Sequence, residues 1–156
     1  MPPSTAVLFG VIPHSAIRNK IADSASFIRE NLEKNWAIIA ADVRAIGETA
    51  DKLDLNDPKY FNREYRNTML SLQVAKPLPG QQVQDIQTLL DFIKGEAPLK
   101  KASVAVHASG LLSPVALQAA ILDGRIDQLY LYRSIHSYME LLQNPLMKDQ
   151  YSYVVP

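Results

Sequence analysis

Apolar residues along this chain follow two patterns that predict different secondary structure. Short apolar runs rich in β-branched or aromatic residues are typical of strands, whereas apolar residues spaced three or four apart mark one face of a helix. Runs of the first kind occupy residues 5–12, 36–42, 102–108 and 127–133, and segments of the second kind lie between them. The sequence therefore predicts strands that alternate with helices.

Prolines, glycines and capping residues set the expected helix ends. Ser15 can cap a first helix, whose apolar face comprises Ile17, Ile21, Ala25, Ile28 and Leu32. A helix over 60–73 is expected to end at the linker 74–80, because two prolines and a terminal glycine interrupt helical backbone. The next helix is predicted over 81–95, with one apolar face made of Val83, Ile86, Leu90 and Ile93.

The helix after the third predicted strand has the clearest end signals. Ser113 is expected to be its N-cap, Pro114 its first helical residue and Gly124 the residue beyond its end. Alternation of strands and helices demands parallel pairing, with helices on the sheet. We therefore expect an α/β fold with a parallel sheet of about four strands flanked by helices on both faces. Residues 1–156 are expected to form a single domain.

Composition narrows the possible functions by exclusion. The 16 basic and 16 acidic side chains cancel, so no broad field attracts nucleic acid or an anionic membrane, and no apolar run is long enough to span a bilayer. The chain has no cysteine, which excludes disulfides, thiolate nucleophiles and cysteine metal sites. The N-terminal segment lacks the basic region of a secretion signal, and the cellular compartment stays open. No cofactor is predicted.

Candidate functional residues follow the predicted strands. His14, Asp42 and His107 come at or near strand ends, and His136 comes slightly later. Parallel strands bring their carboxyl ends to one rim of the sheet, where ligands of α/β proteins bind. Each histidine could instead be a loop residue that bonds to backbone. No metal site is predicted, because these residues lack the spacing of known zinc motifs.

Two segments resemble α/β-hydrolases of the acetyl xylan esterase kind. Residues 38–49, IIAADVRAIGET, resemble an Asp-x-Arg-Gly-x-Gly-Glu-Thr segment of that family, with Ala45 at the first glycine. Residues 103–131 resemble the family's nucleophile elbow, its helix and the next strand, and the overall resemblance covers residues 5–139. It implies a truncated α/β-hydrolase-like fold in which Asp42 and Arg44 form an ion pair that braces a loop beside the site. Glu48 and Thr49 are expected to cap local structure.

The elbow lacks the family's reactive atom. Aligned on the helix that follows, the pattern places Gly110 at the nucleophile position, and glycine has no hydroxyl with which to form an acyl-enzyme. A shift of one residue would instead make Ser109 the nucleophile, although a small turn residue with a locally bonded hydroxyl fits Ser109 as well. His136 could serve as its base, but no acid that would orient this histidine is identified.

The resemblance and the elbow together give two functional hypotheses, and a purely structural role is the third possibility. The favoured one is an esterase-like module that is catalytically inactive or incomplete and that binds a carbohydrate, an ester or a partner domain. The alternative is an active acetyl xylan-type esterase with Ser109 as nucleophile and His136 as base. The aromatic residues near 130–138 either stack on sugar rings or pack at the end of the sheet.

The few strands have a consequence for assembly. Residues 36–42 and 127–133 become the edges of the sheet, and unprotected edges seek partners. We therefore expect a homo-oligomer, or packing against a neighbouring domain if the chain is a piece of a larger hydrolase.

Overall fold

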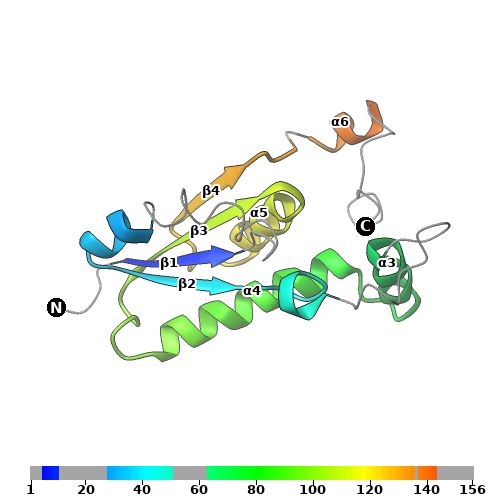
Figure 1. Ribbon diagram of the computed structural model, residues 1–156. Coiled ribbons are helices and arrows are strands. Elements are labelled where there is room, and N and C mark those ends of the chain that lie inside the picture. The colour runs from blue at the N-terminus through cyan, green and yellow to red at the C-terminus, as the bar shows by residue number, and fades with distance from the viewer. Residues whose placement is uncertain (1–4, 11–27, 51–62, 136, 144–156) are drawn as a thin grey trace.

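The computed structural model describes residues 5–10, 28–50, 63–135 and 137–143 (Figure 1). Strands and long helices alternate along most of this length, and residues 28–33 are also helical. In chain order the elements are β1 (Thr5–Gly10), β2 (Trp36–Ala41), η1 (Gly47–Thr49), α3 (Arg63–Gln73), α4 (Leu78–Gly95), β3 (Ser103–Ser109), η3 (Gly110–Leu112), α5 (Ser113–Leu122), β4 (Gln128–Tyr132) and α6 (Tyr138–Gln143).

The strands pair in parallel in the order β2-β1-β3-β4. Val7 of β1 lies opposite Ile38 on one side and Ala105 on the other, and His107 of β3 lies opposite Tyr130 of β4. The predicted combination of helices with a parallel sheet is confirmed. β1 lies between β2, which follows it in the chain, and β3, which comes later, so the direction of winding reverses between β1 and β3.

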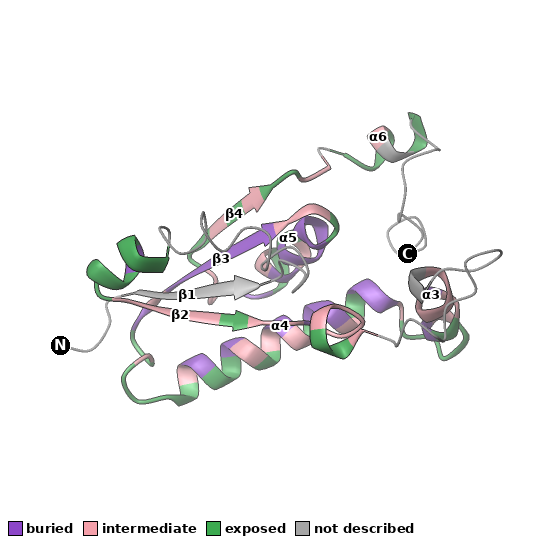
Figure 2. Cartoon of the chain, in the orientation of Figure 1, coloured by how far each residue is buried: buried purple, intermediate pink, exposed green. Residues whose placement is uncertain are grey.

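The core lies between one face of this sheet and the helices α4 and α5 (Figure 2). Every second residue of β3 points into it, namely Val104, Val106 and Ala108. The predicted apolar face of α4 is confirmed, since Val83, Ile86, Leu90 and Ile93 are all buried. Burying one such side chain contributes about 1.5–3 kcal/mol to folding. The helix predicted to begin at Ser15 lies mostly outside the described residues.

Two predicted helix starts are wrong. α4 begins at Leu78, so Pro79 and Gly80 belong to its first turn. Proline is tolerated there because an N–H in the first turn has no intrahelical partner anyway. Ser113 is not an N-cap: η3 leads directly into α5, Leu112 takes the cap position, and the buried Ser113 hydroxyl donates a hydrogen bond to the carbonyl oxygen of Tyr132 at 3.4 Å.

The short helix at 28–33 presents a different side from the one expected. Ile28 and Leu32, assigned to its apolar face, are exposed, whereas Asn31 is buried. Residues 28 and 32 lie one turn apart on the same side of a helix, so both turn outward together when the opposite side faces the protein. The prediction that Ile28 and Leu32 belong to a buried apolar face is therefore wrong.

Asp127 joins the beginnings of β3 and β4. Its carboxylate accepts hydrogen bonds from the backbone N–H of Val104 at 2.8 Å and from the hydroxyl of Ser103 at 3.1 Å. Its own backbone N–H donates to the carbonyl oxygen of Val104 at 2.9 Å. These three bonds fix which residues of the two strands lie opposite each other.

Every helix in the described part of the chain is too short or too polar to cross a membrane.

Candidate functional site

The carboxyl rim of the sheet gathers residues with left-handed backbone. Ala45 (φ 66°) and Gly47 (φ 58°) follow β2, Gly110 (φ 62°) follows β3, and Arg133 (φ 53°) follows β4. Left-handed backbone costs a residue other than glycine about 1–2 kcal/mol. Such strained positions persist at functional sites when the surrounding structure holds them in place.

Gly110 lies next to the point where ligands bind in this class of fold. In open α/β sheets that point is the crevice beyond the carboxyl ends of the strands, where the direction of winding reverses. Here the reversal occurs between β1 and β3. β3 ends at Ser109, and Gly110 is the next residue. The rim at Gly110 is therefore the candidate site.

The turn at Gly110 has the outline of a nucleophile elbow. Ser109 is still extended (φ −135°, ψ 143°), Gly110 turns the chain with its left-handed backbone, and η3 and α5 follow at once. Within the part of the chain that the structure describes, a Cβ atom added to Gly110 would have no heavy atom within 4 Å, apart from those of its two chain neighbours. No described residue covers the apex of the turn, but glycine places no reactive atom there.

Ser109 belongs to the strand and not to the apex of the turn. It is half-buried and lies opposite Tyr132 in the β3–β4 pairing. Alternate residues of a strand share one face of the sheet, so Ser109 lies on the same face as His107. Its hydroxyl makes no capping bond to the described turn η3. The shifted alignment thus places its serine before the bend.

His107 lies inside β3, near the end of the strand at Ser109. Pairing with β4 continues as far as Ser109 and Tyr132, which extends β3 beyond the histidine. The imidazole is buried and stacks on Tyr130, with ring centroids 4.4 Å apart and 15° between the ring planes. Burial lowers the pKa of His107 below 6.5 and so favours the neutral imidazole.

Tyr130 and Tyr132 extend this stack toward the surface. Both tyrosines are exposed, and the Tyr132 ring lies 6.0 Å from the His107 ring with 16° between their planes. The Tyr132 hydroxyl and His107 Nδ1 are hydrogen-bonded at 3.3 Å, and the Tyr130 hydroxyl donates to Oε1 of Gln128 at 3.0 Å. We call His107, Tyr130 and Tyr132 the aromatic shelf. It lies on the same sheet face as Ser109, beside the open turn.

The loop after β2 is built around the carboxylate of Asp42. This carboxylate accepts a hydrogen bond from the backbone N–H of Glu48 at 3.0 Å. A Cβ atom on Gly47 would lie only 1.9 Å from Asp42 Oδ2, so only glycine fits at position 47. The Thr49 hydroxyl donates to the carbonyl oxygens of Val43 and Ile46, at 2.8 and 2.7 Å respectively. Thr49 thus caps local structure, as expected.

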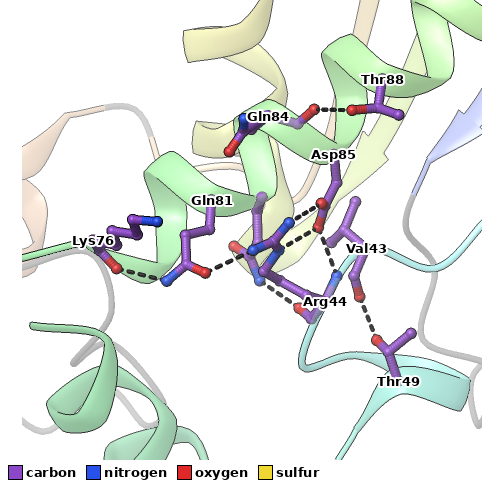
Figure 3. Close-up of polar contacts among 9 residues, drawn as sticks. Val43, Arg44, Thr49, Lys76, Gln81, Gln84, Asp85 and Thr88 are labelled. Atoms are coloured by element: carbon purple, nitrogen blue, oxygen red, sulfur yellow. Dashed lines mark hydrogen bonds and ion pairs between the residues drawn. The ribbon is translucent and has the colours of Figure 1, made fainter. Parts of the chain in front are cut away.

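The expected ion pair between Asp42 and Arg44 is wrong. Arg44 pairs instead with Asp85 of α4 (Figure 3). Its guanidinium donates to the carboxylate of Asp85 through Nε, at 2.8 Å, and through Nη2. Nη1 donates to Oε1 of Gln81 at 2.6 Å, and the amide of Gln82 donates to the Arg44 carbonyl at 3.1 Å. The loop is therefore held against the first turns of α4.

Asp85 contacts the loop of the candidate site, and the sequence pattern did not single it out. It also accepts a hydrogen bond from the backbone N–H of Arg44 at 3.0 Å. Burial raises the pKa of Asp85, but the hydrogen bonds and charge of Arg44 outweigh burial and leave the pKa below its usual value. The only sequence signal that could have identified Asp85 is its charge, because it is an acidic residue next to the apolar face of its helix.

Two candidate residues cannot be placed. His14 and His136 are outside the described residues, so the suggested pairing of Ser109 with His136 stays a prediction. Within residues 5–10, 28–50, 63–135 and 137–143, no group of three metal-ligating side chains comes together.

No protein family, no curated protein and no solved structure matches the chain.

Proposed function

We propose that this chain is a truncated α/β-hydrolase-like module that does not catalyse acyl transfer and that binds a ligand at the carboxyl rim of its sheet. The observation that carries the proposal is Gly110, which turns the strand into the helix with left-handed backbone where a hydrolase holds its serine. With no hydroxyl at the apex, no covalent acyl intermediate can form there.

The loop after β2 supports the hydrolase-like assignment. Both positions where the resembled segment carries glycine, 45 and 47, have left-handed backbone. Ala45 keeps this conformation although it carries a Cβ atom, and Gly47 is required by the adjacent Asp42 carboxylate. The resemblance thus corresponds to left-handed backbone at both positions, which favours glycine, and to a steric requirement for glycine at position 47.

The aromatic shelf supports a binding role and favours a carbohydrate as ligand. Sugar rings present flat C–H surfaces that pack on aromatic faces, and their hydroxyls bond to phenol groups. Tyr130 and Tyr132 are exposed side by side on one face of β4, with Gln128 next to them on the same face. Tyrosine combines an apolar ring with a polar end, which suits a ligand of this kind.

The absence of catalysis is tested with a fluorophosphonate probe, followed by mass spectrometry of the intact chain, and with p-nitrophenyl acetate. We expect no adduct, and equal background hydrolysis by the parent chain, by Ser109→Ala and by the control Ser113→Ala. An adduct on Ser109, or hydrolysis lost only in Ser109→Ala, would show an active esterase and overturn this part of the proposal.

The binding role is tested by thermal unfolding with acetylated and unacetylated xylo-oligosaccharides. A ligand that binds the folded chain raises its Tm by mass action. We expect a rise with the parent chain and a smaller rise with Tyr132→Ala. Tyr138→Ala changes an exposed tyrosine of α6, outside the shelf, and should respond like the parent. The absence of any rise for the parent, or an equal rise for Tyr132→Ala, would reject the shelf as a sugar site.

A further inference from the structure

His107 and Tyr130 form a face-to-face stack across two neighbouring strands. They lie opposite each other in the β3–β4 pairing, and their ring centroids are 4.4 Å apart with 15° between the ring planes. Neighbouring strands of a sheet are about 4.8 Å apart, so the line that joins the two rings runs across the strands. Both rings therefore stand upright on the sheet, and His107 covers the inner face of Tyr130.

The outer face of Tyr130 points beyond the edge of the sheet. β4 is the last strand in the order β2-β1-β3-β4, and among the described residues it pairs with β3 alone (Figure 1). Although His107 covers one face of its ring, Tyr130 remains 41% exposed. The exposed face is thus the one on the side of the free edge of β4.

Tyr132 continues this flat surface along the strand. The planes of Tyr130 and Tyr132 lie within 15° and 16° of the His107 plane, so the two tyrosine rings are roughly parallel to each other. The two residues are separated by two positions of one strand, which is about 6.6 Å along its axis. Their rings form two adjacent flat faces along the edge of β4.

Tyr132 is held in this arrangement through its hydroxyl. Its ring centroid is 6.0 Å from that of His107, too far for close contact between the ring faces. The hydroxyl is hydrogen-bonded to His107 Nδ1 at 3.3 Å, which ties the end of this exposed side chain to a buried imidazole. Ordering an exposed side chain during binding reduces affinity, so a ring that is already held binds a ligand more tightly.

We infer that His107 is a positioning residue that holds Tyr130 and Tyr132 upright, so that a chain of at least two sugar rings binds along the free edge of β4. This inference rests on the proposed binding of a carbohydrate at the aromatic shelf. A single sugar ring is no wider than one phenol ring and covers one tyrosine, whereas successive rings of a chain cover both. No residue of Gln128–Tyr132 is charged, which suits a neutral sugar chain.

The length of the ligand is tested by calorimetric titration of the parent chain with xylose and with xylotetraose. We expect xylotetraose to bind at least about 10-fold more tightly, because it packs on two aromatic faces instead of one. Equal affinities for the two sugars would overturn the inference that the ligand spans both rings. Absence of binding by either sugar would reject the proposed function, and this inference with it.

The role of His107 is tested by a double-mutant cycle with xylotetraose. His107→Phe keeps a ring opposite Tyr130 but removes Nδ1, and Tyr132→Phe removes the hydroxyl that bonds to it. Each change should weaken binding about 5-fold, and the two together should weaken it no more than one alone, because both remove the same bond. The control Tyr138→Phe changes an exposed tyrosine of α6 and should bind like the parent.

Nuclear magnetic resonance of the ring at position 132 tests the positioning without a ligand. We expect one χ1 rotamer in the parent and averaging among rotamers in both His107→Phe and Tyr132→Phe. Tyr132 is exposed, so Tyr132→Phe should fold and remains informative even if His107→Phe does not fold. A single rotamer in Tyr132→Phe, or effects on xylotetraose binding that multiply in the double variant, would overturn the positioning role. Either result would leave the proposed function intact, provided that the parent binds xylotetraose.

Discussion

Replacing Asp85 by asparagine tests how firmly the loop after β2 is held to α4. The Asp85 carboxylate accepts two bonds from the Arg44 guanidinium and one from the Arg44 backbone N–H. The single oxygen of asparagine can still accept from the backbone N–H and from Nε, but its amide NH₂ would then face the donor Nη2. A hydrogen bond to a charged group contributes about 1.5–3 kcal/mol when it is shielded from water.

Exposure reduces this value. The side chain of Arg44 is 42% exposed and that of Asp85 is 24% exposed, so solvent screens much of the ionic attraction. We therefore expect Asp85→Asn to lower the free energy of unfolding by about 1.5 kcal/mol at pH 7. The measurement is urea unfolding followed by the fluorescence of Trp36, the single tryptophan of the chain.

The loss should depend on pH with a definite sign. The pKa of Asp85 is lower in the folded chain than its usual 3.8. A carboxylate of this kind stabilises the fold fully above its unfolded pKa, and the contribution is lost as the pH falls through the folded pKa. The difference between the parent and Asp85→Asn should therefore be constant above about pH 5 and should shrink below pH 4.

Asp91→Asn is the matched control on the same helix. Asp91 pairs with Arg125, but its side chain is 70% exposed. We expect this change to cost less than about 0.5 kcal/mol. If Asp85→Asn costs no more than Asp91→Asn, or if its cost stays the same at pH 3 and pH 7, the account of the Arg44–Asp85 contact is refuted.

Three further predictions use the same unfolding measurement. Gly47→Ala should lower the free energy of unfolding by about 3 kcal/mol, because its Cβ would overlap the Asp42 carboxylate and its backbone is left-handed; a loss below about 1 kcal/mol would contradict the packing of this loop. Ala45→Gly should raise it by about 0.5–1 kcal/mol, because glycine relieves the left-handed strain at a smaller entropic cost, and a destabilised variant would argue against strain at this position. Burial lowers the pKa of His107, so the parent should lose stability as the pH falls below 6.5 toward the folded pKa, and a stability difference from His107→Phe that does not change between pH 7.5 and 5.5 would disprove this.

Much of the core could be predicted from apolar periodicity alone. The buried face of α4 follows from Val83, Ile86, Leu90 and Ile93 because a helix repeats every 3.6 residues. The start of the same helix could not be predicted from its prolines, since a proline is compatible with a first turn and incompatible only with later ones. Local signals therefore predict which residues are buried better than they predict where a helix begins.

Contacts between distant segments were the part that sequence could not supply. Arg44 and Asp85 are 41 residues apart, and nothing in their spacing indicates that they meet. The resemblance suggested Asp42 as the partner of Arg44, but the Asp42 carboxylate accepts a hydrogen bond from the N–H of Glu48 instead. The turn at Gly110 was different, because its position follows from the order of strand, glycine and helix within one short segment.

The carboxylate of Asp127, just before β4, affects which side chains lie at the carboxyl end of that strand. A shift of one residue between β3 and β4 would turn each side chain of β4 to the other face of the sheet. Leu129 and Leu131 would then face solvent, while the two tyrosines would enter the aliphatic interior. Asp127 anchors Val104 near the start of β3. The aromatic rings of β4, and not its aliphatic side chains, therefore lie beside His107. A single acidic residue remote from the rim thus dictates the chemical character of the rim.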